Sequence, residues 1–149
     1  MEEIKGTEDI IKNYREDVEK LTRYIPWLET KSGNDVVSSY RAEQSTFSFP
    51  VYDGTLMSFV KEAQKTKLMN RNYHYTYSRN RIKTAKEELG LIRSATIKDF
   101  GVLCDILSKY VLGGMTRAQV WREGVEKRIF LEVLTKLKEL IEFWDKPLA

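Results

Sequence analysis

Cysteine, histidine, proline and glycine are all scarce in this chain of 149 residues, which has one cysteine, one histidine, three prolines and eight glycines. A single cysteine, Cys104, excludes an intrachain disulfide framework, and together with His74 it cannot supply the three or four protein ligands of a zinc site. Because proline and glycine interrupt helices, their scarcity favours long helices over many short strands. We therefore expect an all-α fold without a metal site.

Long apolar runs are absent as well. No stretch approaches the roughly 20 apolar residues that cross a bilayer. The start of the chain, Met1-Glu2-Glu3-Ile4-Lys5, is charged and lacks the apolar core of a signal peptide. Hydrophobic residues make up 42% of the chain and charged residues 32%, a balance that is typical of globular proteins. We predict one domain, residues 1–149, located in the cytoplasm and without a membrane partner.

The clearest periodic patterns lie at the two ends of the chain. Over Thr7–Lys31, apolar residues recur three or four positions apart, at Ile11, Tyr14, Val18, Leu21, Ile25 and Leu28. Thr7 suits the N-cap of this helix, and Pro26 predicts a kink or break near Tyr24. A similar pattern over Glu126–Trp144 predicts a second long amphipathic helix. We expect these two helices to pack together and to frame a compact bundle of about six helices.

Shorter helices are expected between these two. The first begins near Asp53 or Thr55, and the second runs through Ile82 and Ile92. The third begins at a capping box, Thr96–Asp99, and stops at Gly113-Gly114. The fourth begins at a capping box, Thr116–Gln119, and is interrupted at Gly124. Residues Asn34–Asp53 are predicted to form a long connection, with a short helix over Val36–Glu43 as the alternative. Residues Asn70–Asn80 alternate tyrosines with polar residues, which is strand-like.

One segment concentrates the positive charge. Between Ala63 and Lys86 there are seven basic residues and no acidic one, which leaves 18 of the 25 basic residues to balance all 22 acidic residues. The same segment contains Tyr73, Tyr75 and Tyr77. Single-stranded nucleic acid is bound by such a mixture, because cations attract its phosphates and aromatic rings stack on its bases. The predicted nucleic-acid or anion-binding residues are Lys65, Lys67, Arg71, Tyr73, His74, Tyr75, Tyr77, Arg79 and Arg81.

The alternative interpretation of this segment is purely structural. The tyrosines would then lie half buried at the edge of the core, and the arginines would pair with Glu87, Glu88 or the acidic first helix. Carboxylates such as Glu87 and Glu88 occur on helices beside basic residues, as they do on solvated faces.

No set of catalytic residues is identifiable. His74 could act as a base only with an orienting carboxylate and a nucleophile, so a surface or packing role is favoured. Cys104 borders an apolar helical stripe, where it is expected to behave as a small hydrophobic residue. We predict no catalytic residue and no cofactor.

Two stretches carry a resemblance to known proteins. They are Pro50-Val51-Tyr52-Asp53 followed by Phe59, and Trp121-Arg122-Glu123-Gly124-Val125 with Ile129-Phe130-Leu131-Glu132-Val133-Leu134 and Leu137. Over the last two thirds of the chain, the pattern resembles a family of small bacterial or phage-associated proteins of unknown function. The family often has glycine where this chain has Arg128, which puts a tight turn there in doubt. The resemblance implies a helical domain and supplies no activity.

Three interpretations of function follow. The first is a non-enzymatic binding or interaction domain, whose partner is another protein or a second copy of the chain. The second is a nucleic-acid-binding protein that uses the basic, tyrosine-rich segment. The third is a small enzyme with its site beneath the connection Asn34–Asp53.

Overall fold

The structure is a computed structural model that describes residues 2–31, 37–39, 50–52, 54–117 and 119–145. In this part of the chain the elements are α1 (Glu2–Thr22), α2 (Ile25–Lys31), β1 (Val37–Ser39), β2 (Pro50–Tyr52), α3 (Gly54–Gln64), α4 (Tyr73–Asn80), α5 (Ala85–Ser94), the 3-10 helix η1 (Ile97–Asp99), α6 (Phe100–Thr116), α7 (Gln119–Glu126) and α8 (Ile129–Asp145). The all-α prediction is confirmed, with eight α-helices among the described residues where about six were expected. The two short strands pair antiparallel, with Ser38 opposite Val51.

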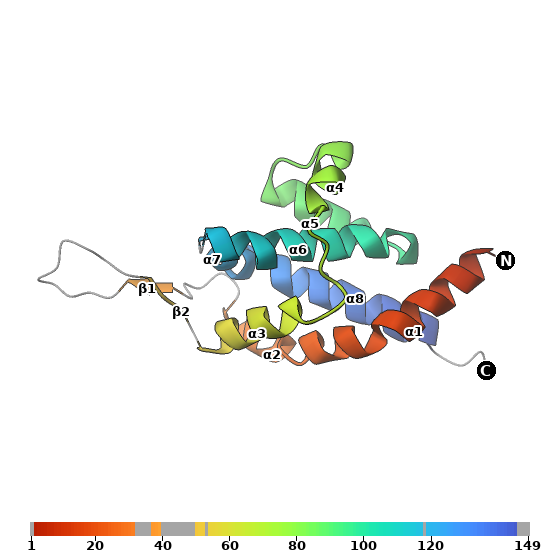
Figure 1. Ribbon diagram of the computed structural model, residues 1–149, viewed down its shortest axis with the longest axis horizontal. Helices are drawn as coiled ribbons and strands as arrows, with labels where there is room; N and C mark the ends of the chain where they lie inside the picture. The colour runs from red at the N-terminus through yellow and green to blue at the C-terminus, as the bar shows by residue number, and fades with distance from the viewer. Residues whose placement is uncertain (1, 32–36, 40–49, 53, 118, 146–149) are drawn as a thin grey trace, which may run out of the picture.

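Helix α8 lies at the centre of the bundle (Figure 1). It packs against α1 and α2 on one side and against α5, α6 and α7 on the other. Helix α4 lies on the far side of α6, so it belongs to the outer layer of the molecule. The prediction that the first and last long helices pack together is confirmed. Val18 and Leu21 of α1 and Val133, Leu134 and Leu137 of α8 are all buried in the core.

The first predicted helix is in fact two helices. The break at Arg23 and Tyr24 confirms the interruption expected from Pro26, which lies in the first turn of α2, where a backbone N–H has no intrahelical partner. The prediction of Thr7 as N-cap is wrong, because α1 begins at Glu2 and Thr7 lies inside it.

Two predicted glycine breaks are also wrong. Helix α6 continues through Gly113 and Gly114 to Thr116, and α7 continues through Gly124. A Cβ on Gly114 would overlap the indole ring of Trp121, and one on Gly124 would lie 2.5 Å from the ring of Phe130. These two glycines therefore allow close helix packing. Since Thr116 is still helical, it is the last residue of α6 and does not cap α7.

The capping box at Thr96 is confirmed. The Asp99 carboxylate accepts a hydrogen bond of 2.9 Å from the backbone N–H of Thr96, and η1 leads directly into α6. The last helix starts at Ile129, three residues later than predicted, because Arg128 adopts a left-handed backbone with φ of 66°. A tight turn is therefore present between α7 and α8, although this chain has Arg128 there instead of glycine.

The two stretches that were hard to classify have different outcomes. The alternative of a short helix over Val36–Glu43 is wrong at Val37–Ser39, which form a strand; residues 40–49 lie outside the described part of the chain. The strand-like interpretation of Asn70–Asn80 is also wrong, because Tyr73–Asn80 form helix α4.

Candidate nucleic-acid interface

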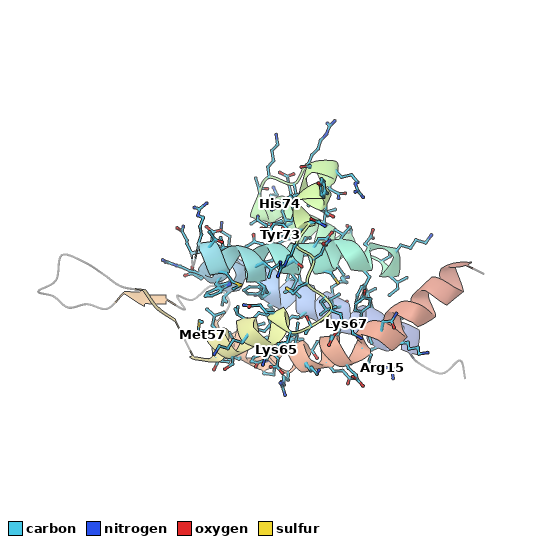
Figure 2. All side chains as sticks on the ribbon, viewed as in Figure 1. Arg15, Met57, Lys65, Lys67, Tyr73 and His74 are labelled. Carbon is cyan, nitrogen blue, oxygen red and sulfur yellow. The ribbon has the colours of Figure 1, made fainter. Side chains whose placement is uncertain are left out.

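The structure divides the basic segment between two places. Tyr73 and His74 lie on α4, above α6, whereas Lys65 and Lys67 lie below α6, beside α1 and α3 (Figure 2). The predicted set of nine binding residues is therefore not one surface. Arg71, Arg79 and Arg81 flank or belong to α4 and stay with its tyrosines.

Helix α4 is short, and its inward residues fix it to the bundle. Thr76 is buried and Tyr77 half buried, whereas His74, Tyr75 and Arg79 are exposed. The Thr76 hydroxyl donates a hydrogen bond to the buried carboxylate of Asp105 on α6. This bond orients α4 on α6.

The connection that leads into α4 is held by the same part of α6. The side-chain amide of Asn70 donates to Asp105 over 2.8 Å, and the backbone N–H of Asn70 donates to the Ser108 hydroxyl over 2.8 Å. Ser108 is fully buried and donates in turn to the Cys104 carbonyl oxygen. Hydrogen bonds thus satisfy these buried polar groups, as burial requires.

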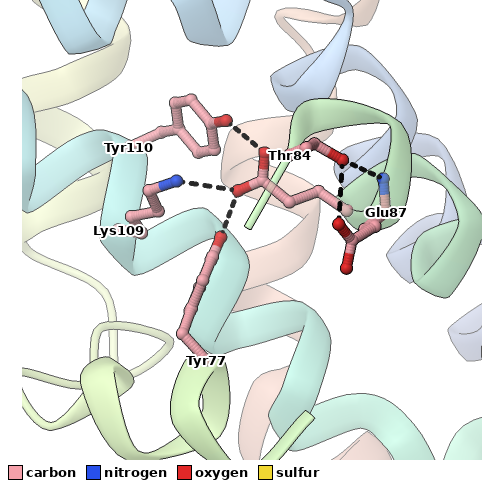
Figure 3. Close-up of polar contacts among 6 residues, drawn as sticks. Tyr77, Thr84, Glu87, Lys109 and Tyr110 are labelled. Atoms are coloured by element: carbon pink, nitrogen blue, oxygen red, sulfur yellow. Dashed lines mark hydrogen bonds and ion pairs between the residues drawn. The ribbon is translucent and has the colours of Figure 1, made fainter. Parts of the chain in front are cut away.

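A second anchor is centred on Glu88 of α5 (Figure 3). Its carboxylate is 1% exposed and accepts hydrogen bonds from the hydroxyls of Tyr77 and Tyr110. The Lys109 ammonium donates to the same carboxylate over 3.1 Å and lies 4.7 Å and 4.9 Å from the centres of the Tyr77 and Tyr110 rings. We call these four residues the Glu88 cluster. It joins α4, α5 and α6 through a single carboxylate.

The prediction that Glu88 belongs to a solvated face is wrong. Glu88 falls three residues after Ala85 and four before Ile92, which places it on the inward stripe of α5. That spacing was available in the sequence. What the sequence could not give is the partner set, because Lys109 and Tyr110 follow more than 20 residues later.

Burial and the adjacent Glu88 carboxylate raise the pKa values of both tyrosines. For Tyr77 and Tyr110 the largest cause is loss of solvation, followed by interactions with Glu88. Both hydroxyls therefore keep their protons at neutral pH and act as hydrogen-bond donors.

The outward side of α4 and the turn that follows it are basic and exposed. We call this region, together with Arg71 before α4 and Lys86 in the first turn of α5, the basic cap. It consists of Arg71, His74, Tyr75, Arg79, Arg81, Lys83 and Lys86, all of them exposed. Tyr75 is 69% exposed. Across the described residues, none of the five arginines and lysines of the cap forms an ion pair.

The structural alternative for the segment is therefore correct for the half-buried Tyr73 and Tyr77, and wrong for the exposed Tyr75 and for the arginines. Tyr77 lies at the core edge and binds Glu88, but Glu88 pairs with Lys109 and with no arginine. Tyr73 is half buried, and its ring lies 4.2 Å from that of His74. The His74 ring is thus supported from one side and exposed on the other.

Cys104 has the environment expected of a small hydrophobic residue. It is 7% exposed, and burial raises the pKa of its thiol to about 12. A thiol with this pKa stays protonated and unreactive at neutral pH. The proposed enzyme site beneath Asn34–Asp53 lies mostly outside the described residues.

Comparison with known proteins adds no assignment. No protein-family model, no curated protein and no solved structure matches this chain. Among the described residues, no helix is both long and apolar enough to cross a membrane. The function must therefore be argued from the residues themselves.

Proposed function

We propose that the protein is a non-enzymatic binding domain whose basic cap binds single-stranded nucleic acid. The observation that carries this proposal is that five exposed cations lie on α4, next to its ends and in the first turn of α5, and form no ion pair with any described residue; they are Arg71, Arg79, Arg81, Lys83 and Lys86. A polyanion would supply the missing negative charge.

Several cations elsewhere in the molecule are paired with carboxylates of the chain itself. Arg23 pairs with Glu62, Arg93 pairs with Glu132 through two hydrogen bonds of 2.9 Å and 2.8 Å, and Lys109 pairs with Glu88. Acidic residues are therefore placed beside cations elsewhere in the bundle and are absent from the stretch 63–86. This contrast favours an external anion as the partner of the cap.

Aromatic side chains on the cap favour single strands over duplexes. Tyr75 is 69% exposed, and His74 is exposed on the same side of α4. Each ring can stack on an unpaired base, with a contribution of about 1–3 kcal/mol per base, and the neighbouring arginines can bind the phosphates on either side. In a duplex the base faces are already stacked on one another and are closed to such contacts.

The inward side of α4 makes this surface rigid. Thr76 is fixed to Asp105 and Tyr77 to Glu88, so the helix that presents Tyr75 and Arg79 is held before a ligand arrives. A preformed surface loses less conformational entropy on binding than a mobile one.

Fluorescence anisotropy with a labelled single-stranded oligonucleotide at low salt tests the proposal. We expect the Arg79→Ala/Lys83→Ala variant to bind about tenfold more weakly than the natural chain, because two phosphate contacts are lost. The matched control is Lys12→Ala/Lys127→Ala, which removes the same charge from exposed positions outside the cap. Its affinity should stay within about twofold of the natural value. Equal losses in the two variants would contradict the proposal.

A further inference from the structure

A second positively charged surface lies away from the basic cap, between α1 and α3. It is a hollow of about 370 Å³ with Lys20, Lys61 and Lys65 at its margin, and Tyr24, Ser58 and Thr66 among its lining residues. We call it the lysine hollow. Figure 2 places Lys65 beside α3, on the opposite side of α6 from Tyr73 and His74.

The carboxylate in the lining does not neutralise these lysines. Glu62 is already paired with Arg23, and it accepts a further hydrogen bond of 2.6 Å from the hydroxyl of Tyr24. Lys20, Lys61 and Lys65 are all exposed, and none of them forms an ion pair within the described part of the chain. The hollow therefore keeps the charge of three ammonium groups.

The three lysines come from α1, from α3 and from the turn that follows α3. Lys20 belongs to α1, whereas Lys61 lies in the last turn of α3 and Lys65 follows it by four residues, which is about one helical turn. Because all three lysines line one hollow but come from separate segments of the chain, we infer that their ammonium groups can reach different oxygen atoms of one anion. The Ser58 hydroxyl supplies a further donor in the lining.

We propose that the lysine hollow binds a phosphate group. Lysine ammonium groups act as mobile point charges toward phosphate and each offer three donors. A phosphate has enough oxygen atoms to accept from several lysines at once, and a volume of about 370 Å³ leaves room for part of the molecule that carries it. This site is independent of the basic cap and of the function proposed for it.

Nuclear magnetic resonance of the full chain tests this site, with inorganic phosphate titrated against chloride at constant ionic strength. We expect saturable shifts of the backbone amides near Lys20, Ser58 and Lys61. The Lys61→Ala/Lys65→Ala variant should weaken the phosphate midpoint about tenfold, as expected when two charged contacts are lost. The Lys12→Ala/Lys127→Ala control should leave the midpoint unchanged. Unsaturable shifts, or an equal midpoint in the hollow variant, would show an adventitious ion only and overturn the proposal.

A single-stranded oligonucleotide, titrated in parallel, identifies the source of the phosphate. If the hollow contacts a nucleic-acid strand, Lys61→Ala/Lys65→Ala weakens oligonucleotide and phosphate binding together. If the hollow binds a free phosphorylated molecule, Lys61→Ala/Lys65→Ala weakens phosphate binding and leaves oligonucleotide binding unchanged. Either result supports the proposed phosphate site. Arg79→Ala/Lys83→Ala changes only the cap, so it should weaken oligonucleotide binding and leave phosphate binding at the hollow intact. The two pairs of substitutions therefore test the two proposals separately, and one proposal can fail while the other holds.

Discussion

Gly113 and Gly114 are neighbours in α6, yet their surroundings differ completely. A Cβ on Gly113 would lie 3.5 Å from Val120, an ordinary van der Waals contact, whereas a Cβ on Gly114 would overlap the indole of Trp121. The indole is also fixed by a hydrogen bond of 2.8 Å from its N–H to the Val111 carbonyl oxygen. The ring therefore cannot move away without losing that bond.

We predict that Gly114→Ala lowers the free energy of unfolding by about 2–3 kcal/mol, because it overpacks a fixed contact between α6 and α7. Gly113→Ala is the control and should raise it by up to about 1 kcal/mol, since alanine is the better helix former. Urea unfolding measures both values. Similar values for the two variants would show that Trp121 does not require glycine.

The backbone of Arg128 is strained at the turn between α7 and α8. Its φ of 66° lies in the left-handed region, which costs a residue with a side chain roughly 1–2 kcal/mol. Arg128→Gly removes that cost but enlarges the conformational freedom of the unfolded chain. We therefore expect a net gain of about 0.5–1 kcal/mol in urea unfolding. Lys127→Gly, at the preceding exposed position, should give no gain; an equal gain would rule out backbone strain at Arg128 as the cause.

At the scale of elements, Glu88 is the residue that joins α4 and α5 to α6. Glu88→Ala would leave the Lys109 ammonium and two tyrosine hydroxyls without their shared partner. We predict a loss of about 2–4 kcal/mol in the free energy of unfolding. Faster hydrogen exchange at the α4 amides should accompany it. Glu87→Ala, at the neighbouring exposed position, should cost less than about 1 kcal/mol. Unchanged exchange in α4 after Glu88→Ala would contradict the anchoring role.

Three buried groups, the thiol of Cys104 and the hydroxyls of Tyr77 and Tyr110, should make the fold less stable at alkaline pH. The pKa of Cys104 rises from 9.0 to about 12, and the pKa values of Tyr77 and Tyr110 rise above 10.0, in each case chiefly because burial disfavours the charged form. Above about pH 9 the unfolded chain loses these protons while the folded chain keeps them. The free energy of unfolding should therefore fall from about pH 9 upward.

Urea unfolding between pH 8 and pH 10.5 measures this slope, which amounts to at most about 1.4 kcal/mol per pH unit for each group. Cys104→Ala removes one contributing group and should flatten the decline at its lower end. A slope that is the same in this variant would exclude Cys104 as a contributor.

The elements also show how far the sequence predicts this fold. The stripe of α6, the capping box at Thr96 and the break at Tyr24 all follow from local spacing. Helix α4 does not, because its tyrosines alternate over too few residues to reveal a period. Its helical form depends on Thr76 and Tyr77 reaching Asp105 and Glu88, which are 29 and 11 residues away in the chain. Partners at such separations carry no local signal.

The two proposed binding surfaces could be predicted only in part from the sequence, for the same reason. Charge density along the chain indicated the basic segment, and the cap from Arg71 to Lys86 lies within it. Lys65 instead joins Lys20 and Lys61, whose proximity depends on the packing of α1 against α3. A count of charges along the sequence cannot separate two surfaces on opposite sides of α6.

Across the whole molecule, charge is distributed unevenly. Apolar residues of α1 and α8 lie in the core, and Arg23, Arg93 and Lys109 are paired with carboxylates, whereas the five cations of the cap form no ion pair with a described residue. Such a distribution predicts binding that is governed by counterion release.

The salt dependence of oligonucleotide binding tests this claim most directly. If the five cations of the cap neutralise five phosphates of a single strand, the plot of log affinity against log salt concentration should have a slope of about −3.5. In Arg79→Ala/Lys83→Ala the slope should weaken to about −2, because two phosphate contacts are missing. A slope near zero, or the same slope in the variant, would contradict the assignment of the basic cap as a nucleic-acid-binding surface.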